Sequence, residues 1–278
     1  MRIYLSADME GITGLVDAID VQPGGADYER GRVMMTEDVN AAVRGALAAG
    51  ATAVTVNDAH GPMRNLLPDL IHPAAALIRG RPKPMGMLEG LSGDFDAAVF
   101  IGYHARAGTL GVLSHSFMGH EIEDMWLDDR PAGEIGLTHA TAAAFGVPVV
   151  AMSGDDAACA EMAAWDPSVT AVAVKEARDR FAAKLLPVAE AREAIEQSVA
   201  AAVRARADAG RMVAETAPRT LAIRWQSASA ASQLEGIPGV KLRDSRTTEV
   251  TGAMPDLFRL LGVFMRAAVA MNGQGPYC

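Results

Sequence analysis

Short apolar runs, separated by stretches with helical character, constrain the fold of this chain more than any other feature. They cover residues 3–7, 53–56, 97–101 and 147–152. Strands that are apolar on both faces and separated by helices are typical of a parallel sheet that is covered on both sides. The sequence therefore predicts an α/β fold with a mostly parallel sheet and helices on both of its faces.

Two helices are expected between these strands. Residues 28–49 place apolar side chains on one helical face, and Gly50 ends the helix. Because acidic residues suit a first turn, a shorter helix that begins at Thr36-Glu37-Asp38 is the alternative. A second helix is expected over residues 138–145, where Gly146 ends it.

The character of the chain changes after residue 166. A strand is expected over 169–174 and a long helix over 189–209. Residues 220–225 alternate in polarity, which is typical of a half-exposed strand in an antiparallel or mixed sheet, and a last helix is expected near 254–271. We therefore predict an α/β metal-binding catalytic domain over 1–166 and a smaller α+β domain over 167–278, with a C-terminal helix that can pack back on the first domain.

Charge and composition exclude several classes of function. The 278 residues include 25 basic and 34 acidic side chains, and the net charge of −9 opposes binding to nucleic acid or to anionic membranes. Neither a signal peptide nor an apolar run of about 18 residues is present. The two cysteines, Cys159 and Cys278, lack the spacing of a zinc clip. These features predict a cytoplasmic protein.

Metal-ligand residues follow the expected strands. Asp8 and Glu10 follow the first run, His60 the second and His104 the third, while Glu134 follows a short strand expected near residues 126–127. The carboxyl ends of parallel strands meet at one edge of a sheet, where ligand sites form. Carboxylates and imidazoles gathered there indicate a catalytic metal centre.

Each of these residues could instead have a structural role. Asp8 or Glu134 would suit a helix N-terminus, and a lone histidine after a strand is usually structural or solvated. Asp58, two residues before His60, would suit a residue that orients the imidazole. It is the repetition at four separate junctions that favours a functional site.

The number of ligands indicates two metal ions. A catalytic zinc ion usually takes three protein ligands and keeps one position open, so five ligands are too many for one ion. Two ions bridged by one carboxylate fit better. Mixed oxygen and nitrogen donors suit zinc, or otherwise manganese or cobalt. Two-metal sites of this kind support hydrolysis.

His115 is the best candidate for proton transfer, because an imidazole titrates near neutral pH. It lies in Ser114-His115-Ser116, where the alternative is a loop histidine bonded to its neighbours. His120 is left unassigned, His72 is expected to be structural, and His139 is expected to be packed or solvated.

Several segments resemble the self-compartmentalising zinc D-aminopeptidases, the family of the peptidase encoded in dipeptide-transport operons. The resemblance covers essentially the whole chain. Its specific segments are Asp8-Met9-Glu10-Gly11, Asn57-Asp58-Ala59-His60, Gly102-Tyr103-His104-Ala105-Arg106, Ser114-His115-Ser116 and Ala132-Gly133-Glu134-Ile135-Gly136, together with residues 28–32, 153–156 and 173–175.

The resemblance implies a site, a substrate class and an assembly. It implies two zinc ions, with Asp8, Glu10, His60, His104 and Glu134 as ligands, Asp8 as the bridge and His115 in a catalytic role. It also implies substrates that are short peptides with a free amino terminus, notably those that start with D-Ala. The implied assembly is a homodecamer of two pentameric rings, face to face, around an inner chamber.

Two other functions are open to the sequence. Asp8 after a first strand also suits the nucleophile of a magnesium-dependent phosphohydrolase, although two imidazoles and the lack of a Walker-type loop oppose this. A non-catalytic peptide-binding protein with a structural metal is the second alternative. Structural zinc sites are closed and usually rich in cysteine, which this set of residues is not.

Overall fold

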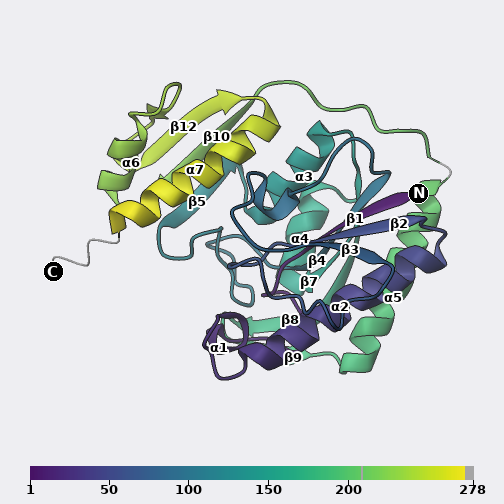
Figure 1. Ribbon diagram of the computed structural model, residues 1–278. Helices are drawn as coiled ribbons and strands as arrows, with labels where there is room; N and C mark the ends of the chain where they lie inside the picture. Colours follow the sequence, from purple (N-terminus) through teal and green to yellow (C-terminus); the bar gives the residue numbers. More distant parts are fainter. Residues whose placement is uncertain (208, 273–278) are drawn as a thin grey trace.

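A seven-stranded sheet forms the centre of the molecule in the computed structural model, which describes residues 1–207 and 209–272 (Figure 1). Its strand order is β3-β2-β1-β4-β7-β8-β9, and all neighbours are parallel except β8 and β9. The strands are β1 (Arg2–Ala7), β2 (Ala53–Asp58), β3 (Ala75–Ile78), β4 (Ala97–Tyr103), β7 (Val149–Asp155), β8 (Thr170–Asp179) and β9 (Ala182–Leu185).

Helices cover both faces of this sheet. The helices α2 (Tyr28–Ala48) and α5 (Val188–Ala207) pack together on one face, where they bury Ile3 and Leu5 of β1. On the other face, α3 (Glu134–Ala144) and α4 (Asp156–Trp165) pack over Tyr4 and Phe100. The predicted α/β fold is confirmed, because each central strand is apolar toward both layers.

The long form of the first predicted helix is correct. The helix α2 begins at Tyr28, so the alternative start at residues 36–38 is wrong. Thr36 and Asp38 are fully buried in the middle of the helix, and the Thr36 hydroxyl donates a hydrogen bond to the Arg32 carbonyl (2.8 Å). The acidic run therefore reflects internal contacts and not a helix start.

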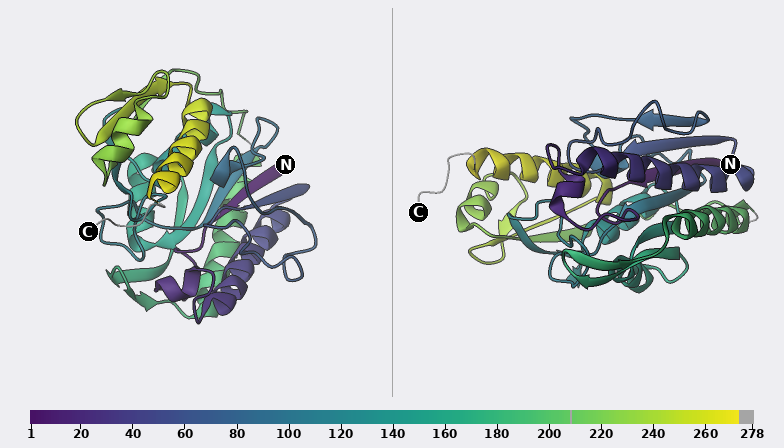
Figure 2. Two further views of the ribbon diagram at one scale, coloured as in Figure 1. Left: turned by 60° about the vertical axis from the view of Figure 1, so that its left-hand side comes forward. Right: turned by 90° about the horizontal axis from the view of Figure 1, so that it is seen from below.

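A second, five-stranded antiparallel sheet lies beside the first. Figures 1 and 2 show most of it, in green and yellow, at one side of the molecule together with its helices. Its order is β11-β12-β10-β5-β6. The elements are β5 (Ile122–Leu127), β6 (Arg130–Pro131), β10 (Arg219–Trp225), β11 (Lys241–Leu242) and β12 (Thr247–Gly252), with α6 (Ala228–Leu234) and α7 (Met254–Asn272).

The division between the sheets does not coincide with the predicted domain boundary at residue 167. The strands β8 and β9 follow that residue but belong to the first sheet, whereas β5 and β6 precede it and belong to the second. One core cluster joins the two parts, and α7 contacts α3 of the first layer. Where the chain divides into domains stays a prediction.

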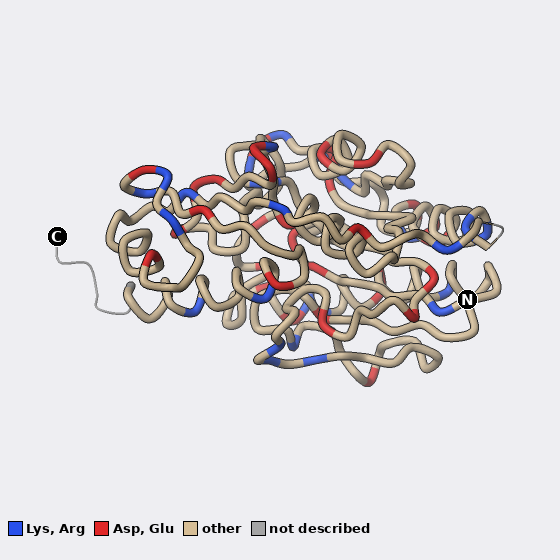
Figure 3. The backbone as a smooth tube through the Cα atoms, turned by 90° about the horizontal axis from the view of Figure 1, so that it is seen from above, with Lys and Arg blue, Asp and Glu red and all other residues tan. Residues whose placement is uncertain are grey.

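The remaining elements are short, namely α1 (Ala18–Val21) and a 3-10 turn η1 (Gly86–Leu88). Acidic and basic residues are interspersed along the chain (Figure 3). Among the described residues, no helix has the length and apolar character to cross a bilayer. Cys159 is half-buried in α4, where burial raises the pKa of its thiol to about 12, and Cys278 lies outside the described residues.

Candidate metal centre

Three neighbouring parallel strands bring the first four predicted ligands together. The strand β1 lies between β2 and β4, with Ala7 in register with Asp58 and Ile101. Asp8 and Glu10 follow β1, His60 follows β2, and His104 directly follows β4. The common direction of the strands therefore places these side chains at one edge of the sheet, as the sequence predicts.

Glu134 reaches the same place from the second sheet. It is the first residue of α3 and follows the β5–β6 hairpin, so the expectation of a fourth strand end at the edge of the parallel sheet is wrong. The helix also begins one turn earlier than residue 138. An extended Gly133 precedes it, and the Glu134 carboxylate accepts a hydrogen bond from the Phe117 N–H (2.6 Å).

The five predicted ligands form two groups that share Asp8. In the first, His60 Nδ1 lies 3.0 Å from Glu10 Oε2 and 3.3 Å from Asp8 Oδ1. In the second, His104 Nε2 lies 3.5 Å from Asp8 Oδ2 and 3.3 Å from Glu134 Oε1. The potential ligand atoms of each group lie within 4.8 Å of one another. Asp8 therefore offers one oxygen to each group.

Backbone carbonyls determine which imidazole nitrogens face the carboxylates. His60 Nε2 lies 2.9 Å from the Val21 carbonyl and His104 Nδ1 lies 2.9 Å from the Ala105 carbonyl. Since a carbonyl oxygen only accepts, each of these nitrogens donates its proton. In the neutral imidazole, the other nitrogen then points a lone pair at carboxylate oxygens. A cation between them removes this repulsion.

Two buried atoms support a cation at this position. Asp8 Oδ2 and His104 Nε2 have no hydrogen-bond partner among the described residues, although both are enclosed by protein. Buried polar atoms without a partner are rare in proteins and call for an explanation such as an ion. A donor set of imidazole and carboxylate groups with these open valences fits a transition metal.

Without a metal, protons take the place of the cation. Burial lowers the pKa of His60 and His104, but the charges of Glu10 and Glu134 respectively outweigh it and raise both pKa values well above the ordinary value. Burial, and then the charge of Glu10, raises the pKa of Asp8 to about 7. Burial raises the pKa values of Glu10 and Glu134, but the charges and hydrogen bonds of the nearby histidines outweigh it and lower both pKa values.

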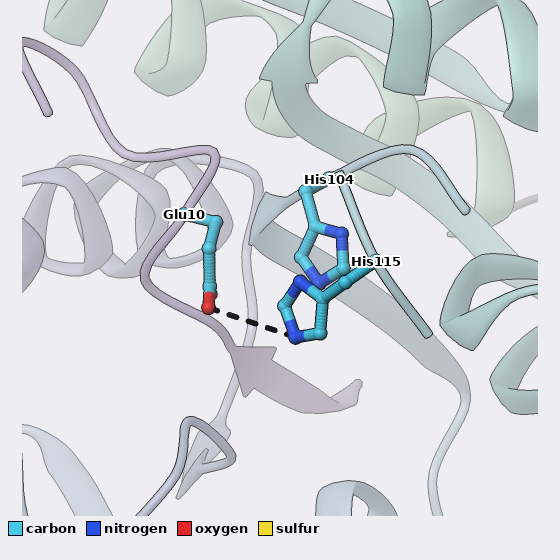
Figure 4. A group of neighbouring side chains, drawn as sticks. All are labelled: Glu10, His104 and His115. Carbon is cyan, nitrogen blue, oxygen red and sulfur yellow. Dashed lines mark ion pairs between the residues drawn. The ribbon is translucent and has the colours of Figure 1, made fainter. Parts of the chain in front are cut away.

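His115 lies over this cluster (Figure 4). Its ring stacks on His104, with centroids 4.2 Å apart and planes 9° apart. His115 Nδ1 donates to the Leu113 carbonyl (2.9 Å), which leaves Nε2 at 3.9 Å from Glu10 and 3.8 Å from Glu134. Burial, and then the charge of His104, lowers the pKa of His115, which favours the neutral form of its ring.

The other histidines lie outside the cluster. His139 Nε2 is 3.1 Å from Asp166 Oδ2, and His72 Nδ1 accepts the Ala74 N–H (3.2 Å). His72 was predicted to be structural, and this contact agrees with that prediction; His139 was predicted to be packed or solvated, and its side chain is part-buried in an ion pair. His120 lines a pocket next to His115. The prediction that Asp58 orients His60 is wrong, because the Asp58 carboxylate bonds Asn65 and the Leu66 N–H in the loop that follows.

Sequence reasoning assigned no role to Lys175, although the residue belongs to one of the family-like segments. It lies in β8 with 1% exposure, and its Nζ donates to the carbonyls of Glu10 (2.6 Å), Ile12 (2.9 Å) and Leu15 (2.5 Å). These bonds hold the loop that presents Glu10. The signal available in the sequence was a lysine at the end of an apolar run.

Asp155 plays a similar part for the loop that carries His115. It ends β7 and is fully buried. Its Oδ2 accepts the Val112 N–H (2.6 Å), and its Oδ1 caps α4 through the Ala158 N–H (2.8 Å). The same carboxylate therefore fixes a helix start and the loop three residues before His115.

Comparison with known proteins gives consistent results. The profile of a family described as D-aminopeptidase matches residues 1–263. A curated D-aminopeptidase of Bacillus subtilis is 40% identical over 248 residues, which cover 89% of this chain and 90% of that protein. The solved structure described as the Zn-dependent D-aminopeptidase DppA from Bacillus subtilis, a self-compartmentalizing protease, is similar with a TM-score of 0.93 at 35% identity and covers both chains completely.

Proposed function

The chain belongs to the D-aminopeptidase family, and from this premise we propose that it is a dinuclear zinc aminopeptidase. Its substrates are short peptides or aminoacyl amides with a free amino terminus, with a preference for D-residues such as D-Ala. The observation that carries the proposal is the sharing of Asp8 by two groups of potential ligands. Asp8, Glu10 and His60 would hold one ion, and Asp8, His104 and Glu134 the other.

Zinc is the metal that we propose for this set of carboxylate and imidazole ligands. The similar solved structure is described as Zn-dependent, and imidazole with carboxylate is a common zinc environment, although manganese or cobalt suits the same donors. When bound, zinc would supply Lewis acidity, which lowers the pKa of water to about 7 and polarises a carbonyl group. The carboxylates and imidazoles of the chain orient and balance that charge.

His115 moves the proton in the proposed reaction. Its Nδ1–H is held by the Leu113 carbonyl, so the basic Nε2 faces the cluster between Glu10 and Glu134. We propose that Nε2 accepts a proton from the water that attacks the scissile carbonyl, and then donates this proton to the amine nitrogen as the C–N bond breaks. General acid–base catalysis by a positioned imidazole contributes about 10²–10⁴-fold to a rate.

The two alternative functions lack support. A phosphohydrolase would need Asp8 as a free nucleophile, whereas both Asp8 oxygens lie against imidazoles of the cluster. A structural metal in a peptide-binding protein would not need a basic imidazole such as His115 beside it. The family match favours peptide cleavage over both.

We further propose that the chain assembles into a homodecamer of two pentameric rings, in line with the self-compartmentalizing nature stated for the similar structure. The mass of the protein in solution tests this assembly. A particle of ten chains is expected, and a monomer at working concentration would contradict the proposed rings.

The experiment that tests the function is a panel of matched D- and L-aminoacyl amides and dipeptides, offered to the zinc-loaded protein. We expect hydrolysis of the D-Ala substrates, a large excess over their L counterparts, and no hydrolysis after zinc is removed by a chelator. Hydrolysis of phosphate esters with magnesium, and no peptide cleavage, would contradict the proposal.

A further inference from the structure

We propose that a pocket beside His115 binds the C-terminal carboxylate of the peptide substrate, and that Arg180 is the residue that recognises it. This inference rests on the proposed function and specifies which short peptides are the substrates. The pocket has a volume of about 330 Å³, and its polar lining includes Ser114, His115, His120, Glu123, Arg180 and Gln226. That volume is at the small end of the range of about 300–1,000 Å³ for small-molecule sites.

The pocket adjoins the exposed side of the metal centre. The side chains of the five predicted ligands are 1–10% exposed, whereas that of His115 is 20% exposed. His115 also lines the pocket and points Nε2 at the ligands (Figure 4). A substrate whose scissile bond lies at the cluster therefore extends its leaving part past His115 into this pocket.

The charges of the pocket favour an anionic end of the substrate. The carboxylate of Glu123 is already paired with Arg224 (3.1 Å) and Arg246 (2.8 Å). It is therefore a poor partner for the substrate ammonium. By contrast, the guanidinium of Arg180 forms no ion pair with any residue that the structure describes. Its central carbon lies 5.5 Å from the centroid of the Phe181 ring.

The backbone of Arg180 is tied to the loop that carries His115. Arg180 lies in the turn between β8 and β9, where its carbonyl accepts the Leu113 N–H (2.8 Å). Leu113 in turn accepts the Nδ1–H of His115. The Asp179 carboxylate bonds the backbone N–H of Arg180 (2.7 Å) and leaves the guanidinium available. The turn therefore places a cation at a defined position relative to the proton-transfer group.

A free guanidinium recognises a carboxylate specifically. Its planar set of donors matches the two carboxylate oxygens, and charge-assisted bonds of this kind are the stronger ones in proteins. An aminopeptidase that meets the leaving carboxylate selects very short peptides, because a longer chain carries that group beyond the pocket. The inferred substrates are therefore dipeptides with a free C-terminus in preference to their C-terminal amides.

The test is the ratio of kcat/KM for D-Ala-D-Ala to kcat/KM for D-Ala-D-Ala amide, measured on the zinc-loaded enzyme. For the natural chain we expect a ratio of about ten or more, since a hydrogen-bonded charge pair is worth roughly ten- to hundredfold in affinity. In Arg180→Ala the ratio should fall to about one, through a higher KM for the free acid. Arg180→Lys keeps the positive charge but loses the planar pair of guanidinium donors, so it should give an intermediate ratio.

Arg178→Ala is the matched control, because Arg178 lies in the same hairpin but is paired with Glu176 (2.6 Å). It should keep the natural ratio. An unchanged ratio in Arg180→Ala, or equal cleavage of the acid and the amide by the natural chain, would overturn the inference alone. Cleavage of neither substrate by the natural chain would overturn the proposed function and this inference with it.

Discussion

At the scale of single residues, the three imidazoles of the site differ in their surroundings and not in their chemistry. Each has one nitrogen bonded to a backbone carbonyl, of Val21, Ala105 or Leu113. The other nitrogen of His60 and of His104 lies 3.0–3.5 Å from two carboxylates, whereas that of His115 lies 3.8–3.9 Å from them. We therefore interpret the first two as metal ligands and His115 as the proton carrier.

His115→Ala should separate these roles. We expect the variant to keep its zinc and its melting temperature, and to lose about 10²–10⁴-fold in kcat, because only the proton transfer is removed. Metal analysis together with steady-state kinetics would check this. Loss of zinc in His115→Ala would make the residue a ligand and contradict the assignment.

The zinc affinity should rise with pH. In the metal-free protein the nearby carboxylates raise the pKa values of His60 and His104 well above the ordinary value, which favours their protonated forms, and the pKa of Asp8 is raised to about 7. Zinc binds only the deprotonated groups, so binding releases protons, and a higher pH favours it by roughly tenfold per pH unit for each proton released. Chelator competition between about pH 6 and pH 8 measures this. A constant affinity would show that no ligand is protonated beforehand.

Lys175→Met should weaken the metal site from a distance. The substitution leaves the carbonyls of Glu10, Ile12 and Leu15 without their donor. We expect an unfolding free energy lower by about 2 kcal/mol, from the unsatisfied carbonyls. We also expect zinc affinity to fall about 10–100-fold, as is usual when a residue that supports a ligand is lost. Lys184→Met, at an exposed position of β9, is the control and should change neither quantity.

At the scale of elements, the close approach of two backbones brings Asp8 near His104. The loop after β1 donates the Gly11 N–H to the Gly102 carbonyl (2.8 Å) at the end of β4. A methyl group on Gly11 would collide with the Tyr103 carbonyl, and Gly102 has a φ of +73° with the Asp8 carbonyl beside it. Both glycines are therefore required by the site geometry.

Gly11→Ala should consequently cost about 3 kcal/mol of stability, because the backbone of the loop or of β4 must move. The movement separates Asp8 from His104, so zinc binding should fall with it. Gly50→Ala is the control: its φ is +89° but open space surrounds it, and we expect a loss of about 1–2 kcal/mol without any change in zinc binding. Equal zinc binding in both variants would show that the glycine contact does not shape the site.

The sequence predicted the elements whose pattern is local. The central strands and α2 were recognisable because their apolar side chains repeat with a fixed period. The position of Glu134 was not recognisable, because the residue follows the hairpin of β5 and β6. In this hairpin β5 pairs with β10, about 100 residues later in the chain. Only the ligand residue itself, between two glycines, was visible as a candidate.

At the scale of the whole molecule, the candidate metal centre lies where the two sheets meet. Asp8, His60 and His104 come from the parallel sheet, and Glu134 from the junction of β6 with α3. A domain boundary predicted near residue 167 from the local pattern does not describe this exchange of strands between the sheets, since pairing between distant strands leaves no local pattern. The second proposed metal group, which needs Glu134, would therefore form only when both sheets are in place.

The zinc content per chain, measured on the purified protein and three variants, tests the central claim most directly. We predict two zinc ions in the natural chain, one in His60→Ala, one in His104→Ala, and none in Asp8→Ala, because Asp8 contributes to both groups. One zinc ion in the natural chain, or an Asp8→Ala variant that keeps both ions, would contradict a dinuclear site bridged by Asp8.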